Sequence, residues 1–236
     1  MLIIGLTGGI ATGKSSASAY FKSQGIPIVD ADKIARLVVE PDRPAYYQIL
    51  KQFGHLNILE TNSRSLDRKR LGDVIFTNEQ MRKQLNRCTH SYIRREALKQ
   101  LIRSFFQFKS IVIWDVPLLF EVGLNRFLAN TLVIFCDQTV QLDHLKKRDN
   151  ISDDEQALKR INAQMDLNEK CRRARYIIDN NSTKDVLHKQ LKDFLTKIQP
   201  SQVNTLVWFV VLCIPLALTY GILRLWDLID QFKYRN

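Results

Sequence analysis

The sequence predicts an α/β fold in which a five-stranded parallel sheet is covered by helices on both faces. Five short apolar runs have the composition of fully buried strands, and they lie at residues 2–7, 26–30, 111–117, 131–137 and 176–181. Helical patterns separate these runs, and that alternation is typical of a parallel sheet. The 236 residues are 45% hydrophobic and 25% charged, which indicates a globular chain with one main domain.

The first two predicted helices end at residues that interrupt helical backbone. A helix over 14–23 follows the first strand and ends before Gly25. A second helix over 31–39 stops because Pro41 disfavours helical backbone in the residue before it. Each of these helices therefore follows a predicted strand, which is the alternation expected of a parallel sheet.

The stretch between the second and third strands is longer than a simple crossover. Residues 44–108 are mostly helical by pattern, with breaks near Gly54 and around residues 62–65. We therefore expect a helical insert over about 41–110.

Charged helices follow the fourth strand. Residues 141–175 predict two helices joined by a turn at 150–152, and Ser152 with Glu155 forms a capping-box pattern. A last helix over 183–198 completes a domain that spans residues 1–198.

The charge distribution favours an anionic partner. The net charge is +11, and residues 61–110 hold twelve Lys and Arg against four acidic residues. Such a protein binds nucleic acid, an anionic membrane or an acidic small molecule, although a solvated helical face accounts for most of these charges. Nucleic acid is disfavoured because no basic stripe with interleaved aromatic residues is present.

The cysteines and the N-terminus suggest a reducing compartment. The four cysteines are far apart and include no CxxC pair, which favours neither a zinc site nor a disulfide framework. The first residues lead directly into a strand and show no secretory signal.

A glycine-rich loop after the first strand predicts a nucleotide-phosphate site. Residues 8–15, GGIATGKS, fit the pattern GxxxxGK[ST] between a buried strand and a helix. Backbone N–H groups of such a P-loop surround phosphate oxygens, and the helix start adds its positive end. The residues predicted to bind ATP here are Gly8, Gly9, Ile10, Ala11, Thr12, Gly13, Lys14, Ser15 and Ser16. Lys14 would reach the β- and γ-phosphates, and Ser15 would ligate Mg²⁺.

Three aspartates lie at the predicted carboxyl ends of strands, where an open α/β sheet binds ligands. One of Asp30 and Asp32 would act as a general base, or Asp30 would cap the next helix. Asp115 ends the third strand, so it either contacts Mg²⁺ or is an ordinary strand-end residue. Together with the P-loop, these positions predict a three-layer fold of the P-loop NTP hydrolase type.

The arginine-rich helices over 141–175 have two interpretations. They contain Arg148, Arg160 and a cluster of Lys170, Arg172, Arg173 and Arg175. A lid that closes over the nucleotide would use such arginines to neutralise transition-state charge. A solvated amphipathic hairpin is the alternative.

The tail 199–236 predicts a transmembrane helix over about 206–223. No charged residue lies between 198 and 223, and the 18 residues of the span would cover about 27 Å as a helix. A buried core helix is the alternative, but it would show a polar face. We expect a membrane-anchored protein whose domain faces the cytosol, at the mitochondrial outer membrane or the endoplasmic reticulum.

Several segments together resemble the dephospho-CoA kinase family. The similar segments are GLTGGIATGKSS (5–16), IVDADKIARLVVEP (28–41), LDRKRLGDVIF (66–76), MRKQLNRCTH (81–90), WDVPLLFEVGL (114–124) and the charged region 148–181. The resemblance covers roughly residues 1–198. It implies that Mg·ATP phosphorylates the ribose 3′-hydroxyl of dephospho-CoA, the last step of CoA synthesis.

The resemblance also implies roles for residues. Asp32 would be the general base, and Lys14 and Arg148 would stabilise the transferring phosphoryl group. Asn180 would lie near the adenine of ATP. The residues expected on the dephospho-CoA side are Asp32, Arg36, Pro117, Leu118, Leu119 and Glu121.

The sequence departs from the family pattern in two places. The family reads H-P-x-I where this chain has His90-Ser91-Tyr92-Ile93, which would loosen a turn. The apolar tail is absent from short bacterial members. A P-loop kinase with another nucleoside or nucleotide acceptor, and a non-catalytic P-loop protein anchored to a membrane, remain the alternatives. The sequence does not indicate an oligomeric state.

Overall fold

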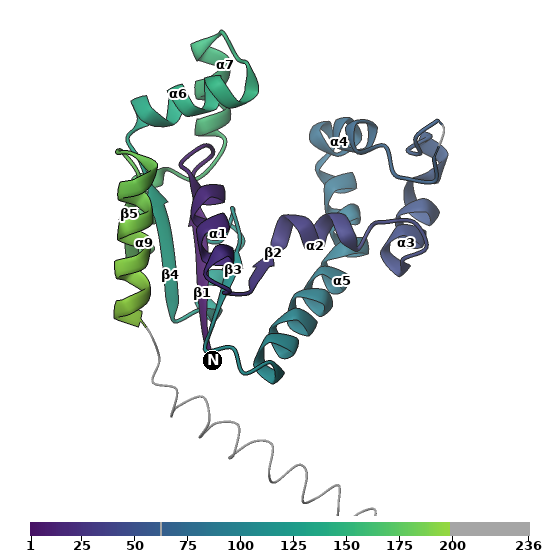
Figure 1. The fold of residues 1–236 in the computed structure, drawn as a ribbon. Coiled ribbons are helices and arrows are strands. Elements are labelled where there is room, and N and C mark those ends of the chain that lie inside the picture. The colour runs from purple at the N-terminus through teal and green to yellow at the C-terminus, as the bar shows by residue number, and fades with distance from the viewer. Residues whose placement is uncertain (62, 199–236) are drawn as a thin grey trace, which may run out of the picture.

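A five-stranded parallel sheet forms the centre of the computed structural model, which describes residues 1–61 and 63–198 (Figure 1). The strand order is β2-β3-β1-β4-β5, and every neighbouring pair is parallel. The strands are β1 (Leu2–Gly8), β2 (Ile28–Asp30), β3 (Ile111–Asp115), β4 (Asn130–Phe135) and β5 (Tyr176–Asp179). The predicted parallel sheet of five strands is confirmed.

Two of the strands are cut short beside a proline that lies in the apolar run predicting them. The run at 26–30 yields a strand only from Ile28, and the run at 111–117 ends as a strand at Asp115. Pro27 and Pro117 lie in the excluded parts and have no backbone N–H to donate to a sheet. Apolar composition therefore located the strands, and proline limits these two.

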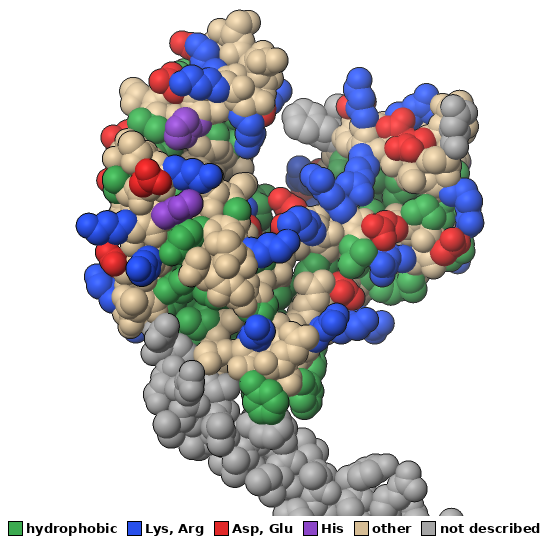
Figure 2. Space-filling view, viewed as in Figure 1, with side chains coloured by type: hydrophobic (Ala, Val, Ile, Leu, Met, Phe, Trp, Pro, Cys, Tyr) green, Lys and Arg blue, Asp and Glu red, His purple; other side chains and the backbone are tan. Residues whose placement is uncertain are grey.

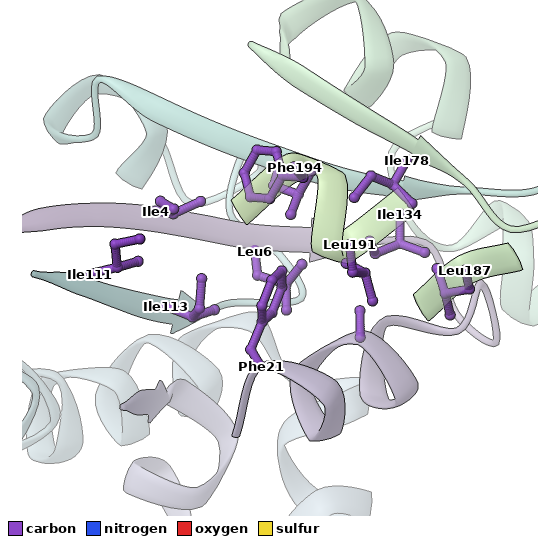
Figure 3. Packing of buried hydrophobic residues seen from close by; sticks show 12 residues of the cluster. Ile4, Leu6, Phe21, Ile111, Ile113, Ile134, Ile178, Leu187, Leu191 and Phe194 are labelled. Atoms are coloured by element: carbon purple, nitrogen blue, oxygen red, sulfur yellow. The ribbon is translucent and has the colours of Figure 1, made fainter. Parts of the chain in front are cut away.

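Helices cover both faces of the sheet and give the predicted three layers. On one face, α1 (Lys14–Ser23) and α9 (Lys184–Ile198) pack against alternate strand residues. Figure 3 shows Phe21 of α1 and Phe194 of α9 in one cluster with the isoleucines of the strands. Their ring centroids are 6.3 Å apart. On the other face, α2 (Ala31–Leu37) and α5 (Glu79–Phe106) enclose a second apolar cluster that includes Val112.

The predicted helical insert lies between β2 and β3 and has an apolar core of its own. It consists of α3 (Pro44–Phe53), a 3-10 turn (Gly54–Leu56), α4 (Arg68–Thr77) and α5. The break expected near Gly54 is present, since α3 ends there. The buried side chains of the core are Tyr46, Ile49, Phe53, Ile58, Leu66 and Leu71.

The expected turn near Ser91 is absent. Residues 90–93 lie inside α5, which continues from Glu79 to Phe106 without a break. Proline inside a helix removes a hydrogen bond and kinks the axis, so Ser91 suits an uninterrupted helix at this position.

The region predicted as two charged helices forms three. They are α6 (Gln138–Asp149), α7 (Asp154–Asn162) and α8 (Leu167–Arg173), and we refer to them together as the lid. The capping box expected from Ser152 is wrong, because Asp153 caps α7 by accepting a hydrogen bond from the Glu155 N–H at 2.9 Å. Asp166 likewise starts α8 by accepting from the Glu169 N–H at 3.0 Å. A second aspartate cap therefore divides the predicted second helix.

The predicted transmembrane helix over 206–223 lies outside the described residues. Among residues 1–61 and 63–198, none of the helices combines the length and the apolar composition needed to cross a bilayer. The described part ends at Ile198, the last residue of α9.

Candidate active site

The glycine-rich loop between β1 and α1 has the backbone of a phosphate-binding nest. Ala11 has a φ of 59° and Gly13 a φ of 93°, and left-handed residues in such a loop turn successive N–H groups to one side. The Thr12 hydroxyl closes the loop from within by donating to the Gly9 carbonyl at 3.0 Å. The predicted P-loop is therefore formed, and α1 begins directly after it at Lys14.

Gly13 has a second reason to be glycine. A Cβ atom at this position would lie 2.2 Å from Asn180 Nδ2. Asn180 needs that space because its Nδ2 donates to the Thr12 carbonyl at 2.9 Å, while its backbone N–H donates to the Phe135 carbonyl at 2.7 Å. The buried Asn180 side chain therefore supports the P-loop backbone, and its contact with adenine stays a prediction.

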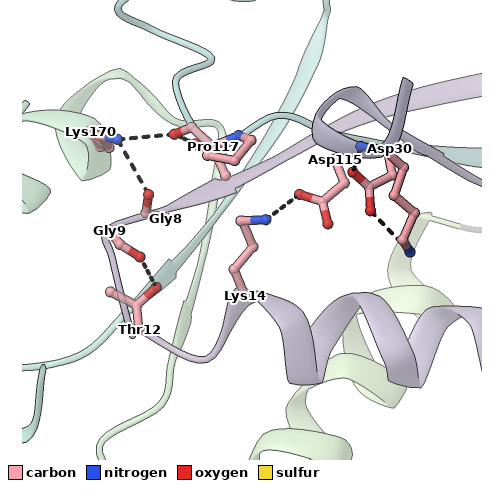
Figure 4. Close-up of polar contacts among 10 residues, drawn as sticks. Gly8, Gly9, Thr12, Lys14, Asp30, Asp115, Pro117 and Lys170 are labelled. Atoms are coloured by element: carbon pink, nitrogen blue, oxygen red, sulfur yellow. Dashed lines mark hydrogen bonds and ion pairs between the residues drawn. The ribbon is translucent and has the colours of Figure 1, made fainter. Parts of the chain in front are cut away.

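Lys14 extends from the start of α1 to the end of β3 (Figure 4). Its Nζ donates to Asp115 Oδ1 at 2.6 Å. Burial raises the pKa of the Asp115 carboxyl, and the positive charge of Lys14 opposes that rise without cancelling it. Asp30 pairs with Asp115 in the register of β2 and β3, so two carboxylates and one ammonium group meet at this edge.

The two aspartates after β2 have different roles in the structure. Asp30 caps α2: its Oδ1 accepts from the Lys33 N–H at 2.9 Å, and its Oδ2 lies 3.1 Å from Lys33 Nζ. Burial acts to raise the pKa of Asp30, but the contacts with Lys33 and the charge of Lys14 outweigh it and hold that pKa low. Asp32 is exposed and has no ion-pair partner among the described residues. The capping alternative therefore applies to Asp30 and leaves Asp32 available.

A cavity of about 490 Å³ lies between α2 and the insert. Its lining includes Asp32 and Arg36 from α2, with Arg68 and His90 from the insert. Neither Arg36 nor Arg68 has an ion-pair partner in the described part of the chain. Figure 2 shows Lys and Arg side chains around the hollow between the sheet and the insert. The geometry therefore provides a carboxylate beside unpaired positive charge, which suits a phosphorylated ligand with a hydroxyl group.

The segment 116–121 follows β3, and we call it the acceptor segment. The Pro117 carbonyl accepts from the Thr7 hydroxyl at 2.9 Å, and Leu118 is 42% exposed. Leu119 is completely buried, so any ligand contact of this residue would use its backbone. Glu121 forms an ion pair with Lys170 at 2.8 Å rather than facing solvent alone.

Lys170 is the site residue that the sequence did not single out. It is 0% exposed, and its Nζ contacts the carbonyls of Gly8 at 3.3 Å and Pro117 at 3.2 Å (Figure 4). The pattern placed it in a cluster of lid cations, and its neighbours Arg172 and Arg173 are indeed exposed. The family that the region 148–181 resembles has a lysine near position 170, and that resemblance is the one signal in the sequence that sets Lys170 apart.

Two lid arginines share one carboxylate. Arg148 Nε lies 2.7 Å from Asp149 Oδ1, and Arg160 Nη1 lies 2.9 Å from Asp149 Oδ2. The hydrogen bond from Arg148 and the charge of Arg160 lower the pKa of Asp149. The arrangement presents two guanidinium groups on adjacent lid helices.

The lid also contacts the tip of the P-loop. Gln164 Oε1 accepts from the Ile10 N–H at 2.9 Å, and Gln141 Nε2 donates to the Ile10 carbonyl at 2.7 Å. His144 Nδ1 lies 3.3 Å from the Ala11 carbonyl. The lid arginines are therefore carried by elements that hydrogen-bond to the P-loop.

The two predicted protein ligands suit a Mg²⁺ ion that is also coordinated by the phosphates of a nucleotide. Ser15 and Asp115 supply hydroxyl and carboxylate oxygens, the ligand type that Mg²⁺ prefers. Within the described ranges, no group of three or more His, Cys, Asp or Glu is suited to a metal site. A protein-only metal cage is therefore absent there, and Mg²⁺ of P-loop enzymes is typically bound with the nucleotide.

Comparison with known proteins identifies the family. The sequence profile of dephospho-CoA kinase matches residues 2–185. The dephospho-CoA kinase of Oceanobacillus iheyensis is 45% identical over 196 residues, which cover 83% of this chain and 97% of that protein. A Danio rerio protein called dephospho-CoA kinase domain-containing protein is 44% identical over 199 residues, covering 84% of this chain and 86% of its own length.

A solved structure agrees with the sequence relatives. The dephospho-CoA kinase from Campylobacter jejuni superposes with a TM-score of 0.64 at 28% identity, covering 84% of this chain and 96% of that one. The similarity therefore includes the sheet, the insert and the lid rather than the P-loop alone. The chain belongs to the dephospho-CoA kinase family.

Proposed function

We propose that this protein transfers the γ-phosphoryl group of ATP to the ribose 3′-hydroxyl of dephospho-CoA, with Asp32 as the general base. One observation carries the assignment of residues. Asp32 lines the basic cavity beside α2, only two residues after Asp30, whose strand partner Asp115 holds the P-loop lysine. The acceptor cavity and the donor loop are therefore adjacent.

The donor half of the reaction uses the P-loop. The P-loop, residues 8–16, and the start of α1 would bind the phosphates of ATP through N–H groups other than that of Ile10, which donates to Gln164. When the phosphates bind, Lys14 would either break its ion pair with Asp115 or contact both groups. It would then neutralise the negative charge of the transferring phosphoryl group. Bound Mg²⁺ supplies charge neutralisation at the phosphates, and Ser15 and Asp115 would hold it.

The acceptor half uses the cavity between α2 and the insert. Arg36 and Arg68 have no carboxylate partners among the residues that the structure describes, so they are available for the diphosphate of dephospho-CoA. Asp32 would take the proton of the 3′-hydroxyl as the new P–O bond forms. Pro117, Leu118 and Glu121 would border the same ligand, and Leu119 would support them from the core.

The lid would complete the site after both substrates bind. Arg148 and Arg160 are held side by side through Asp149, which keeps two positive charges on one surface of the lid. Closure would bring Arg148 to the transferring phosphoryl group and exclude water.

A direct assay tests the proposal. The purified full-length protein is mixed with ATP, Mg²⁺ and dephospho-CoA, and CoA is measured by chromatography. We expect CoA and ADP in equal amounts. A panel of adenosine, AMP and pantetheine 4′-phosphate tests the choice of acceptor. Tight ATP binding without CoA formation, or faster turnover of another acceptor, would contradict the proposal.

We also propose that residues 206–223 attach the protein to a membrane. The support is the sequence alone: an uncharged run from 198 to 223 that is long enough to cross the hydrocarbon core. A variant that lacks 201–236 is expected in the supernatant after ultracentrifugation of a cell lysate, with the full-length protein in the pellet. If the shortened chain still pellets with membranes, the attachment lies elsewhere.

A further inference from the structure

Lys170 has the most completely satisfied buried charge in the described part of the protein. Its side chain is 0% exposed, and three oxygen atoms surround its Nζ: the Gly8 carbonyl at 3.3 Å, the Pro117 carbonyl at 3.2 Å and Glu121 Oε1 at 2.8 Å. An ammonium group has three N–H donors, so each donor has one acceptor. The surroundings of Lys170 therefore match the hydrogen-bonding needs of an ammonium group.

Burial of this charge has an energetic cost that packing alone does not explain. Removing an ammonium group from water is expensive, and an apolar pair of similar volume is often neutral or more favourable for stability. Lys170 therefore needs a role besides filling space in the core. The three acceptors indicate that role, because they belong to separate functional segments.

The first acceptor, Gly8, ends β1 and begins the P-loop, which is the donor half of the site. The other two, Pro117 and Glu121, belong to the acceptor segment after β3. Lys170 itself lies in α8 of the lid. One side chain thus joins three segments that the reaction has to align.

Neighbouring contacts strengthen the same junction. Glu121 Oε1 also accepts from the Met165 N–H at 3.2 Å, at the entrance of α8. Gln164 binds the Ile10 N–H of the P-loop at 2.9 Å. The base of the lid is therefore fixed to both halves of the site through adjacent residues of one short segment.

We infer that Lys170 is a positioning residue, which sets the acceptor segment and the base of the lid at a fixed place relative to the P-loop. This inference rests on the proposed kinase function. Lys170 is too enclosed to touch substrate, so it acts through Gly8, Pro117 and Glu121. Loss of Lys170 misaligns the acceptor hydroxyl relative to the γ-phosphate of ATP. It has less effect on the affinity for ATP, because the N–H groups of the P-loop remain.

The test compares Lys170→Met with Lys159→Met in the full-length protein. Lys159 is 74% exposed on α7 and pairs with Glu155, so it controls for loss of a lid lysine. We expect Lys170→Met to lower kcat for CoA formation about 100-fold, since misalignment of reacting groups has effects of that order. The Kd of ATP should change less than about 3-fold, and Lys159→Met should match the wild type in both quantities.

A second variant keeps the test decisive if Lys170→Met unfolds. Lys170→Met combined with Glu121→Met replaces the ion pair with two apolar side chains, and we expect its thermal midpoint near that of the wild type. A folded double variant that binds ATP normally and makes CoA slowly supports the positioning role. Wild-type kcat in either folded variant overturns it. Absence of CoA formation by the wild type would instead contradict the proposed function itself.

Discussion

Lys14 of the P-loop and Asp115 at the end of β3 form a direct ion pair, with Nζ and Oδ1 2.6 Å apart. The lysine side chain is 17% exposed and that of the aspartate 5%. Burial raises the pKa of Asp115, and the charge of Lys14 limits that rise, so the lysine favours the charged form of the carboxyl group. The pair holds both groups at the position where phosphates and Mg²⁺ would bind.

Replacement of Asp115 by asparagine should affect catalysis more than stability. We expect Asp115→Asn to lower kcat at least about 100-fold at limiting Mg²⁺, because a charged ligand and the partner of Lys14 are lost. The thermal midpoint should shift by less than about 5 °C, since the buried charge is removed together with its desolvation cost. Asp137→Asn, at the exposed start of α6, is the control. An unchanged Mg²⁺ dependence would refute a metal role for Asp115.

Replacement of Asp32 tests the general base. We expect Asp32→Asn to lower kcat by about 10²- to 10⁴-fold, because the asparagine amide cannot accept the hydroxyl proton. ATP affinity should stay within about 2-fold of the wild type, since Asp32 lies in the acceptor cavity. Glu40→Gln, also exposed near α2, controls for loss of a negative charge. Full activity of Asp32→Asn would exclude it as the base.

Arg36 should contribute to acceptor binding and leave ATP binding unchanged. We expect Arg36→Gln to raise the KM for dephospho-CoA about 10-fold, which corresponds to about 1.4 kcal/mol. Arg43→Gln is the control, because Arg43 is already paired with Glu40 at 3.4 Å. Steady-state kinetics with each substrate varied in turn distinguishes the two constants. Equal rises in both KM values would place Arg36 outside the acceptor site.

Asp149 should keep the lid arginines in place over the whole working pH range. Its native pKa lies below the ordinary value of 3.8, so its contribution is complete above that value and is lost as the pH falls through the native pKa. We therefore expect Asp149→Asn to lower kcat about 10-fold by the same factor at every pH between about 5 and 9. A pH–rate profile measures this. A factor that varies with pH in that range would contradict the assignment.

Alanine substitutions at Gly13 and Gly25 distinguish backbone strain from a steric clash with a neighbouring side chain. Both have positive φ, 93° and 72°, so alanine should cost about 1–2 kcal/mol of folding free energy at either position. Only Gly13 has a neighbour in the way, Asn180. We expect Gly13→Ala to lose ATP binding as well, whereas Gly25→Ala binds ATP normally. Chemical denaturation and nucleotide titration provide the two measurements.

Local composition was sufficient to predict the sheet and its layers. Apolar runs identify buried strands because both faces of this sheet are covered, and the motif of the glycine-rich loop lies in adjacent residues of the sequence. The helix boundaries of the lid were harder to predict. Asp153 and Asp166 cap α7 and α8, so new helices begin there although the helical periodicity of the surrounding residues continues. Caps of this kind are visible in a sequence, but the choice between Ser152 and Asp153 depends on backbone geometry.

The role of Lys170 was beyond any local pattern. Its acceptors Gly8, Pro117 and Glu121 come from residues 162, 53 and 49 positions away in the chain, so its burial follows from the tertiary fold. Asp32 and Asp30 show the converse case. Their neighbourhood predicted both a cap and a base, and the hydrogen bond from the Lys33 N–H decides which residue is the cap.

The insert keeps its apolar interior apart from that of the sheet, and this separation has an evolutionary consequence. Side chains such as Tyr46, Phe53 and Leu71 pack among themselves, and α2 and α5 connect them to the strands. Mutations in the interior of the insert can therefore change the wall that it gives to the acceptor cavity with little effect on the packing of the sheet.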